Sequence, residues 1–165
     1  MNRSHLARLA ALTLAAVACG PSLAADNTTL NVSATVQGVC KLYTSATGAA
    51  LGAGTLAMAF TLDPSVGGAA TQTTDVFYKC TSGTSAIAIQ LAGAGSPYAG
   101  TLTGTGTALG NSIPYSISWT NPATAGAGFA SDAQFVTLTG TIAAADYIAK
   151  LAGPYGQNVP LTLTP

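Results

Sequence analysis

The sequence contains no glutamate and very little charge of either sign. Lys and Arg together number five, Asp numbers five and there is one His, so charged residues make up 6% of 165, where about 25% is usual. So little positive charge excludes a nucleic-acid-binding surface, which needs clustered Lys and Arg to neutralise phosphates. The 48% hydrophobic content excludes a disordered polyelectrolyte, since such chains combine high charge with low hydrophobicity. The length suits one domain with a sizeable core.

The first 24 residues have the layout of a secretory signal peptide. Two arginines precede a largely apolar run at residues 9–18, and small residues then supply a cleavage site after Ala24 or the next alanine. The run is too short to cross a bilayer as a helix, but it matches the apolar part of a signal peptide. We therefore expect export and removal of residues 1–24. A lipoprotein signal with Cys19 as the lipidated residue is the second-ranked alternative.

Two cysteines, Cys40 and Cys80, remain once the signal peptide is removed. Exported proteins meet an oxidising environment, so a pair of cysteines is expected to form a disulfide. A metal site would need further ligands, and the mature chain contains no His to provide them. We predict a disulfide between Cys40 and Cys80, which would stabilise the fold by roughly 4 kcal/mol, and we expect no metal and no cofactor.

Apolar and polar residues alternate with a period of two along the mature chain, which predicts about seven short strands. The apolar members are Leu30, Val32, Ala34 and Val36; Leu56, Met58, Phe60 and Leu62; Val76, Tyr78 and Cys80; Ile87, Ile89 and Leu91; Ile113, Tyr115, Ile117 and Trp119; Val136, Leu138 and Ile142; and Val159, Leu161 and Leu163. Stretches rich in Gly and Thr separate them as turns. Pro114 and Pro160 lack an amide donor and indicate edges or bulges. Residues 143–151 are the one helix-like stretch, with an irregular turn as the alternative. The pattern predicts an all-β, antiparallel β-sandwich.

No catalytic pattern stands out in the sequence. The mature chain lacks His, the usual base that activates a nucleophile, and both its cysteines are expected to be oxidised. The five Asp residues are scattered, so the sequence indicates no two of them as the paired carboxylates of a glycosidase. Asp63 precedes a proline in a turn signal, and Asp132 and Asp146 lie in polar connections. We therefore expect a protein that is not an enzyme.

A set of segments, in this order, resembles one known family. The segments are Val39 with Cys40, residues 80–84, residues 87–91, residues 111–117 with Trp119, and residues 152–155 leading into 159–164. Over residues 26–165 they resemble the spore coat protein U domain, found in the subunits of archaic (Csu-type) chaperone–usher pili. The chain departs from the family pattern at residues 56–60, at Gln157 in place of an acidic residue, and in the uncharged stretch before Asn111.

The resemblance implies an immunoglobulin-like sandwich that lacks its final strand. Residues 159–164 would then border an open groove, with Val159, Leu161 and Leu163 facing the core. Unpaired backbone groups beside an open core favour pairing with another chain. In this family a periplasmic chaperone first lends a strand. At the outer-membrane usher, the N-terminal extension of the next subunit replaces that strand by β-strand addition.

In this chain the donor extension would be residues 25–38, followed by the domain at residues 39–165. An extension of this kind must be exposed, extended and alternating, so that one face fills pockets while the backbone pairs. The side chains that would fill the pockets are Leu30, Val32, Ala34 and Val36. The alternative is that residues 28–37 form the domain's own first strand.

The resemblance thus implies a structural subunit of a surface pilus, exported through the periplasm and acting in adhesion or biofilm formation. Its partners would be copies of itself or homologous subunits, joined head to tail, together with the chaperone and the usher. One alternative is a secreted, spore-coat-like surface protein. Another is a tip adhesin, for which Tyr98 and Phe129 are candidate contact residues, although packing in the core or loops fits both better.

Overall fold

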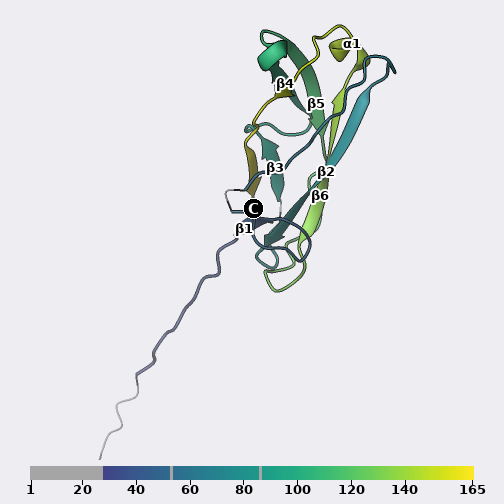
Figure 1. Cartoon of the computed structure of the whole chain (residues 1–165). Coiled ribbons are helices and arrows are strands. Elements are labelled where there is room, and N and C mark those ends of the chain that lie inside the picture. The colour runs from purple at the N-terminus through teal and green to yellow at the C-terminus, as the bar shows by residue number, and fades with distance from the viewer. Residues whose placement is uncertain (1–27, 53, 86) are drawn as a thin grey trace, which may run out of the picture. The chain divides into compact units, whose positions relative to one another are not determined.

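The computed structural model describes residues 28–52, 54–85 and 87–165. The chain divides into two units, Met1–Ala34 and Thr35–Pro165, and the fold is that of the second. Figure 1 shows its elements. In chain order they are β1 (Cys40–Tyr43), β2 (Ala70–Cys80), β3 (Ala88–Leu91), β4 (Tyr98–Gly104), the 3-10 turn η1 (Gly106–Ala108), β5 (Ser112–Ser118), β6 (Gln134–Ile142), α1 (Ala144–Tyr147), β7 (Tyr155–Gly156) and β8 (Leu161–Thr164).

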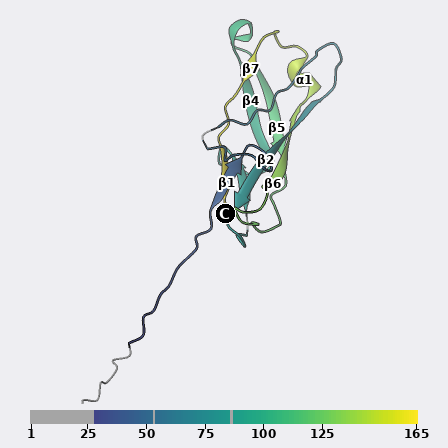
Figure 2. The same cartoon turned by 60° about the horizontal axis from the view of Figure 1, so that its bottom comes forward.

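Six of the strands form one antiparallel sheet with the order β1-β2-β6-β5-β4-β7. Its centre is the long pair β2 and β6, which are in register over nine positions from Ala70↔Ile142 to Tyr78↔Gln134 and run side by side in Figure 1. Figure 2 shows β1 beside β2, and β7 beside β4. Period-two alternation gives this sheet one apolar face, because successive side chains of a strand point to opposite sides.

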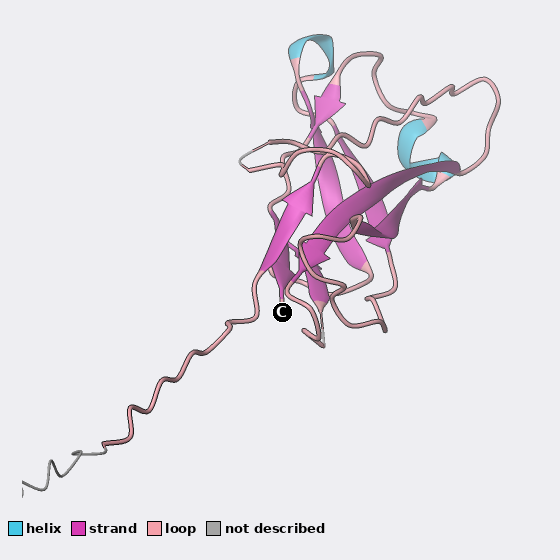
Figure 3. Ribbon diagram, turned by 90° about the horizontal axis from the view of Figure 1, so that it is seen from below, coloured by secondary structure: helices cyan, strands magenta, loops and turns pink. Residues whose placement is uncertain are grey.

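A two-stranded antiparallel sheet of β3 and β8 shares the core of the six-stranded sheet. Ile89 and Leu91 of β3 are buried together with Val76 and Tyr78 of β2 and Ile117 of β5. In Figure 3 strands dominate the domain, and helix is confined to two short pieces. The prediction of an all-β, antiparallel fold is confirmed, and the shared core makes it sandwich-like.

The predicted disulfide joins Cys40 of β1 to Cys80 of β2. The two residues are also register partners in the β1–β2 ladder, with Cα atoms 4.1 Å apart. The disulfide therefore fixes the first strand of the domain to the central pair of strands, at the buried end of β2 where Cys80 has no exposed surface.

Two predicted strands are not strands in the structure. Residues 28–37 and residues 56–62 keep their alternation in sequence, but neither segment belongs to a ladder. Conversely, the sequence interpretation missed β1, β4 and β7. β4 contains two glycines and three threonines or alanines among seven residues, and β7 is only two residues long, so neither shows an apolar alternation.

The remaining local predictions differ from the structure in extent. The helix-like stretch 143–151 contains α1, which spans only four residues. Pro114 lies in the interior strand β5, opposite Thr101 of β4, but the register of β5 with β6 begins at Ser116. The missing amide of Pro114 therefore faces a side without a ladder partner, as a proline in a sheet requires.

The predicted signal peptide, residues 1–24, and the lipoprotein alternative at Cys19 lie outside the described residues. In the part of the chain that the structure describes, no helix has the length and apolarity needed to span a membrane.

Candidate functional site

An apolar groove with a volume of about 590 Å³ lies at the end of the domain that carries α1 and β7. Its lining comes from the segment before β2, from the interior of β4 and β5, and from the chain between α1 and the segment after β7. The residues are Met58, Ala59, Phe60, Leu62, Pro64, Leu102, Ile113, Tyr147, Lys150, Leu151, Ala152, Gly153, Pro154, Tyr155, Gly156 and Gln157. Lys150 is the one charged residue among them, so the groove favours apolar side chains.

One wall of the groove is the extended segment of residues 55–62. Its side chains alternate between half-buried and exposed, and the half-buried ones (Leu56, Met58, Phe60 and Leu62) pack against the core. Among the described residues, no backbone–backbone hydrogen bond joins this segment to a strand. Its backbone accepts a side-chain hydrogen bond from Thr74 Oγ1, which donates to the carbonyl oxygen of Ala57 at 3.1 Å. The segment thus has the side-chain pattern of a strand without a ladder partner.

Gly140 of β6 makes room for this wall. A Cβ atom built there would contact Met58 Sδ and would lie 2.6 Å from Phe60 Cζ. Both approaches are closer than van der Waals contact, so a larger residue at position 140 would require the side chains of Met58 and Phe60 to shift away from β6. The position of the wall therefore depends on a residue 80 positions later in the sequence.

The opposite wall is the chain from β7 towards β8, and Gln157 anchors it. The Gln157 Oε1 oxygen accepts one hydrogen bond from the Thr101 backbone amide at 3.0 Å and another from the Tyr115 hydroxyl at 2.8 Å. Burial, with Tyr98 close by as a lesser cause, raises the pKa of Tyr115 to about 12. The hydroxyl is therefore protonated at neutral pH and available as the donor.

Beyond the groove, the predicted edge residues Val159, Leu161 and Leu163 are half-buried and pack against the core. Within the described part of the chain, β8 pairs with β3 alone, and β7 ends the six-stranded sheet. Each of these C-terminal strands consequently has one edge without a ladder. Unpaired strand edges are sites where another strand can add.

Residues 28–37, the predicted donor segment, belong to no strand, and their side chains are exposed. Leu30 and Val32 are each 84% exposed and Val36 is 82% exposed, and Ala34 is exposed too. Use of this segment as a donor in another subunit, and the alternative in which it forms the domain's own first strand, both stay predictions. Three apolar side chains with this exposure are unfavourable in water and available for burial elsewhere.

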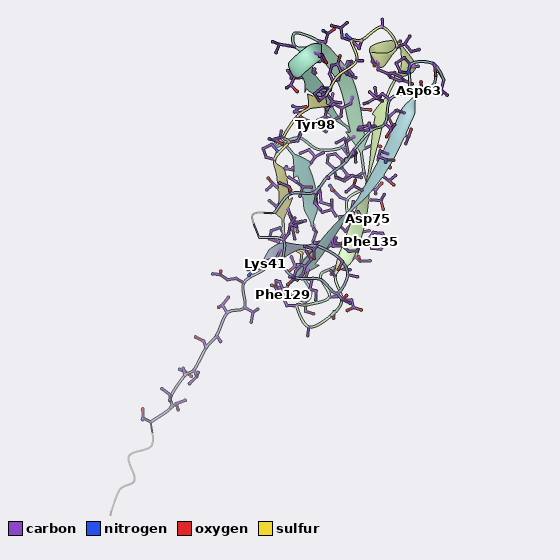
Figure 4. The ribbon with its side chains drawn as sticks, in the orientation of Figure 1. Lys41, Asp63, Asp75, Tyr98, Phe129 and Phe135 are labelled. Carbon is purple, nitrogen blue, oxygen red and sulfur yellow. A yellow bond between two sulfur atoms is a disulfide. The ribbon has the colours of Figure 1, made fainter. Side chains whose placement is uncertain are left out.

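Two of the described aspartates, Asp63 and Asp75, make separate hydrogen bonds. Asp63 initiates a turn, as predicted: its Oδ1 oxygen accepts hydrogen bonds from the Ser65 hydroxyl at 2.6 Å and amide at 2.9 Å, which lower the pKa of its carboxyl group. Asp75 accepts a hydrogen bond from Thr137 across the sheet. Figure 4 shows Asp63 and Asp75 at different levels of the domain. Among the described residues, no three His, Cys, Asp or Glu side chains gather as a metal site would require.

The two candidate adhesin residues have different surroundings. Tyr98, at the start of β4, is 9% exposed and packs in the core, with its ring centroid 6.2 Å from that of Tyr115. Phe129, in the connection between β5 and β6, is 41% exposed. Of these two residues, Tyr98 packs in the core, and Phe129 offers an aromatic surface to solvent.

Sequence reasoning named the 159–163 edge, which is not part of the groove lining, and it missed the residues that do line the groove. The alternation at Leu56–Leu62 was visible, but a ladder was expected there, and the pattern carries no sign that the backbone has no partner. The role of Gly140 and the anchoring by Gln157 depend on contacts across long sequence separations. The chain matches no protein-family model, no curated protein and no solved structure.

Proposed function

We propose that this protein is a non-catalytic structural subunit that polymerises by donor-strand complementation, as its resemblance to spore coat protein U domains implies. The observation that supports the proposal is a set of partly buried apolar side chains that pack against the core from segments 55–62 and 159–163. Among the described residues, these segments lack a ladder partner on at least one side. A strand laid along residues 55–62 or along β8 would find backbone groups to pair with and apolar side chains to cover.

The donor would be residues 25–38 of another copy or of a homologous subunit. Leu30, Val32, Ala34 and Val36 share one face of an extended chain, and they are exposed. Full burial of each larger side chain would contribute roughly 1.5–3 kcal/mol. Because donor and acceptor are different surfaces of one subunit, the contact is head to tail and, unless its rotation closes a ring, it extends into a fibre.

Charge agrees with this pairing. The donor segment, residues 25–38, has one charged side chain, Asp26 near its start, and residues 27–38 are uncharged. The groove lining has one charged side chain, Lys150. Burying a charge without a partner is costly, so an uncharged strand is the appropriate occupant of such a groove. Recognition would rest on apolar fit and on backbone pairing.

In this proposal the domain is an immunoglobulin-like sandwich with one strand missing beside the groove. A periplasmic chaperone would occupy the open edge first, and the outer-membrane usher would be the place where the next subunit's extension replaces it. The product would be a pilus on the cell surface that acts in adhesion or biofilm formation.

The decisive experiment compares Val32→Asp with Asn31→Asp, expressed with the export machinery. Both variants add one negative charge to the extension. Residue 32 lies on the face that would fill the pockets, with Leu30, Ala34 and Val36, whereas residue 31 lies on the opposite face. We expect the unaltered chain and Asn31→Asp to give ladders of polymers that resist SDS and collapse on boiling. Val32→Asp should give only monomer. Polymers of normal length from Val32→Asp would contradict the proposal.

Hydrogen exchange separates the pilus subunit from the spore-coat-like alternative. In the unassembled chain, amides of residues 55–62 should exchange quickly, because no backbone hydrogen bond to another described residue protects them. Assembly should slow them about a hundredfold or more, as it would for any newly formed ladder. A soluble monomer in which these amides are already protected would favour a closed, secreted surface protein instead.

A further inference from the structure

The N-terminal extension leaves its own domain at a fixed place. The Val39 amide donates to Thr81 Oγ1 at 3.0 Å, and the Thr81 amide donates to the Val39 carbonyl oxygen at 2.9 Å. Thr81 Oγ1 also donates to the Gln37 carbonyl oxygen at 3.1 Å. We call this part of the domain the root end. It consists of residues 37–41, residues 79–84 and the connection 126–133, which backbone hydrogen bonds tie to residues 80–84 and to Ala46.

The other end of the domain is built from three connections that hydrogen bonds hold together. The Tyr147 hydroxyl donates to the Gly68 carbonyl oxygen at 2.7 Å, and Thr107 Oγ1 donates to the Ala152 carbonyl oxygen at 2.8 Å. We call this the α1 end, and it consists of residues 63–68, 105–109 and 144–154. Figure 1 shows α1 and β1 at opposite ends of the domain. Figure 4 shows Asp63 at one end, with Lys41 and Phe129 at the other.

The α1 end exposes large apolar side chains from all three of its connections. Val66 and Leu109 are each 76% exposed, Leu151 is 57% exposed and Ile148 is 46% exposed. Because the connections are hydrogen-bonded to one another, these side chains gather at one end of the domain. An exposed apolar surface of this kind is typical of a site that another molecule covers.

The length of the linker between two subunits indicates what covers this surface. The argument rests on the proposed function, in which Leu30 to Val36 of one copy occupy the groove of another. Val39 is hydrogen-bonded within its own domain, so only three residue steps separate the filled groove from the root end of the donor subunit. Three steps of roughly 3.6 Å give at most about 11 Å. Two domains joined by so short a linker lie in contact.

The polymer also determines which end of the acceptor is covered. Each subunit receives one neighbour's extension and gives its own extension to another neighbour. Its root end faces the subunit that receives its extension, so a second neighbour cannot occupy the same place. The donor therefore leaves the groove at the α1 end, where the lining of the groove lies. The contact joins two different surfaces, as a head-to-tail fibre requires.

The charges of the two ends are complementary. The α1 end has two aspartates and one lysine, and the root end has two lysines and one aspartate. They are Asp63, Asp146 and Lys150 at the α1 end, and Lys41, Lys79 and Asp132 at the root end. Opposite net charges favour contact between unlike ends over contact between like ends.

We propose that the α1 end of each subunit packs against the root end of the next copy, as a second interface beside the donor strand. Val66, Leu109 and Ile148 of one copy would face Val39 and Phe129 of its neighbour. Val39 and Phe129 are each 41% exposed, so both surfaces have apolar area to bury. The interface would hold successive domains in one orientation, which the donor strand and its short linker do not fix alone.

The test compares side-chain oxidation by hydroxyl radicals in polymers and in unpolymerised subunits of the full chain. Oxidation of Val66, Leu109 and Phe129 should be severalfold slower in polymers, because the interface excludes water from them. Pro114, which is exposed on the outer face of β5, should be oxidised equally in both.

Leu109→Asp separates the second interface from donor-strand pairing. Residue 109 does not line the groove, so ladders that resist SDS should persist. The protection of Val66 and Phe129 should be lost, because the interface would bury a charge without a partner. Ser116→Asp adds the same charge on the outer face of β5 and should keep both the ladders and the protection. Val66→Asp, at an equally exposed position, gives the same measurement if Leu109→Asp does not fold.

The outcomes distinguish this inference from the proposed function. Polymers of the unaltered chain in which Val66, Leu109 and Phe129 are oxidised as fast as in free subunits would overturn the second interface and leave donor-strand pairing standing. Full protection in polymers of Leu109→Asp would do the same. A chain that forms no polymer at all would overturn the proposed function, and the second interface with it.

Discussion

Residues 76–80 and residues 56–62 carry the same alternation of apolar and polar side chains, yet they have different backbone surroundings. The first segment lies in β2, with β1 on one side and β6 on the other, and Val76, Tyr78 and Cys80 are buried. The second lies over β6, without a ladder, and its apolar side chains are half-buried. Alternation of apolar and polar residues therefore indicates which face of a segment meets the core. It does not indicate whether a second strand lies close enough for backbone hydrogen bonds.

The largest effect is expected from breaking the pairing of β1 with β2. Replacing both Cys40 and Cys80 by Ser removes the link that holds β1 against residues 76–80. The free energy of unfolding should fall by about 2–5 kcal/mol, measured by urea unfolding. The unaltered chain in reductant should show the same loss. An unchanged midpoint in both would mean that β1 pairs without help from the disulfide.

A smaller effect is expected from displacing the unpaired wall. Gly140→Ala places a Cβ atom against Met58 and Phe60, and the overpacking should lower the free energy of unfolding by about 1–3 kcal/mol. Gly156→Ala is the matched control, because a Cβ there meets no atom within 4 Å. Equal stabilities of the two variants would show that residues 58 and 60 do not rest on β6.

The anchoring of the opposite wall can be tested at Gln157. Gln157→Leu removes the acceptor of the Thr101 amide and the Tyr115 hydroxyl, which should reduce stability by about 1–2 kcal/mol. Gln157→Glu keeps an acceptor oxygen and should retain most of the stability. If neither substitution changes the free energy of unfolding in urea, the Thr101 amide and the Tyr115 hydroxyl donate to water instead, and packing holds the wall.

The smallest effect concerns pH. The pKa of Tyr115 is raised by burial from an ordinary value of 10.0 to about 12, and burial raises the pKa of Tyr78 as well. Between these pH values the unfolded chain releases a proton that the folded chain keeps, so stability is fully present below about pH 10 and falls as the pH rises towards 12. Urea midpoints across this range should decline, and Tyr115→Phe should flatten the decline.

Much of the domain could be predicted because the signals are local. The alternations at Val76–Cys80, Ile113–Ile117 and Val136–Ile142 are strands, and Asp63 initiates the turn that its following proline indicated. β4 was not predictable in this way, since its glycines and threonines show no alternation and its pairing comes from β5 and β7.

The sequence by itself determined the all-β class, the disulfide between Cys40 and Cys80 and the apolar face of each extended segment, because these depend on residue type and spacing. Tertiary structure alone decided which alternating segments acquire a ladder, where the groove opens, and that Gly140 and Gln157 hold its walls. The physical reason is that a side-chain pattern is a property of one segment. A hydrogen-bonded ladder is a property of two segments, and the second segment can be far away in the sequence.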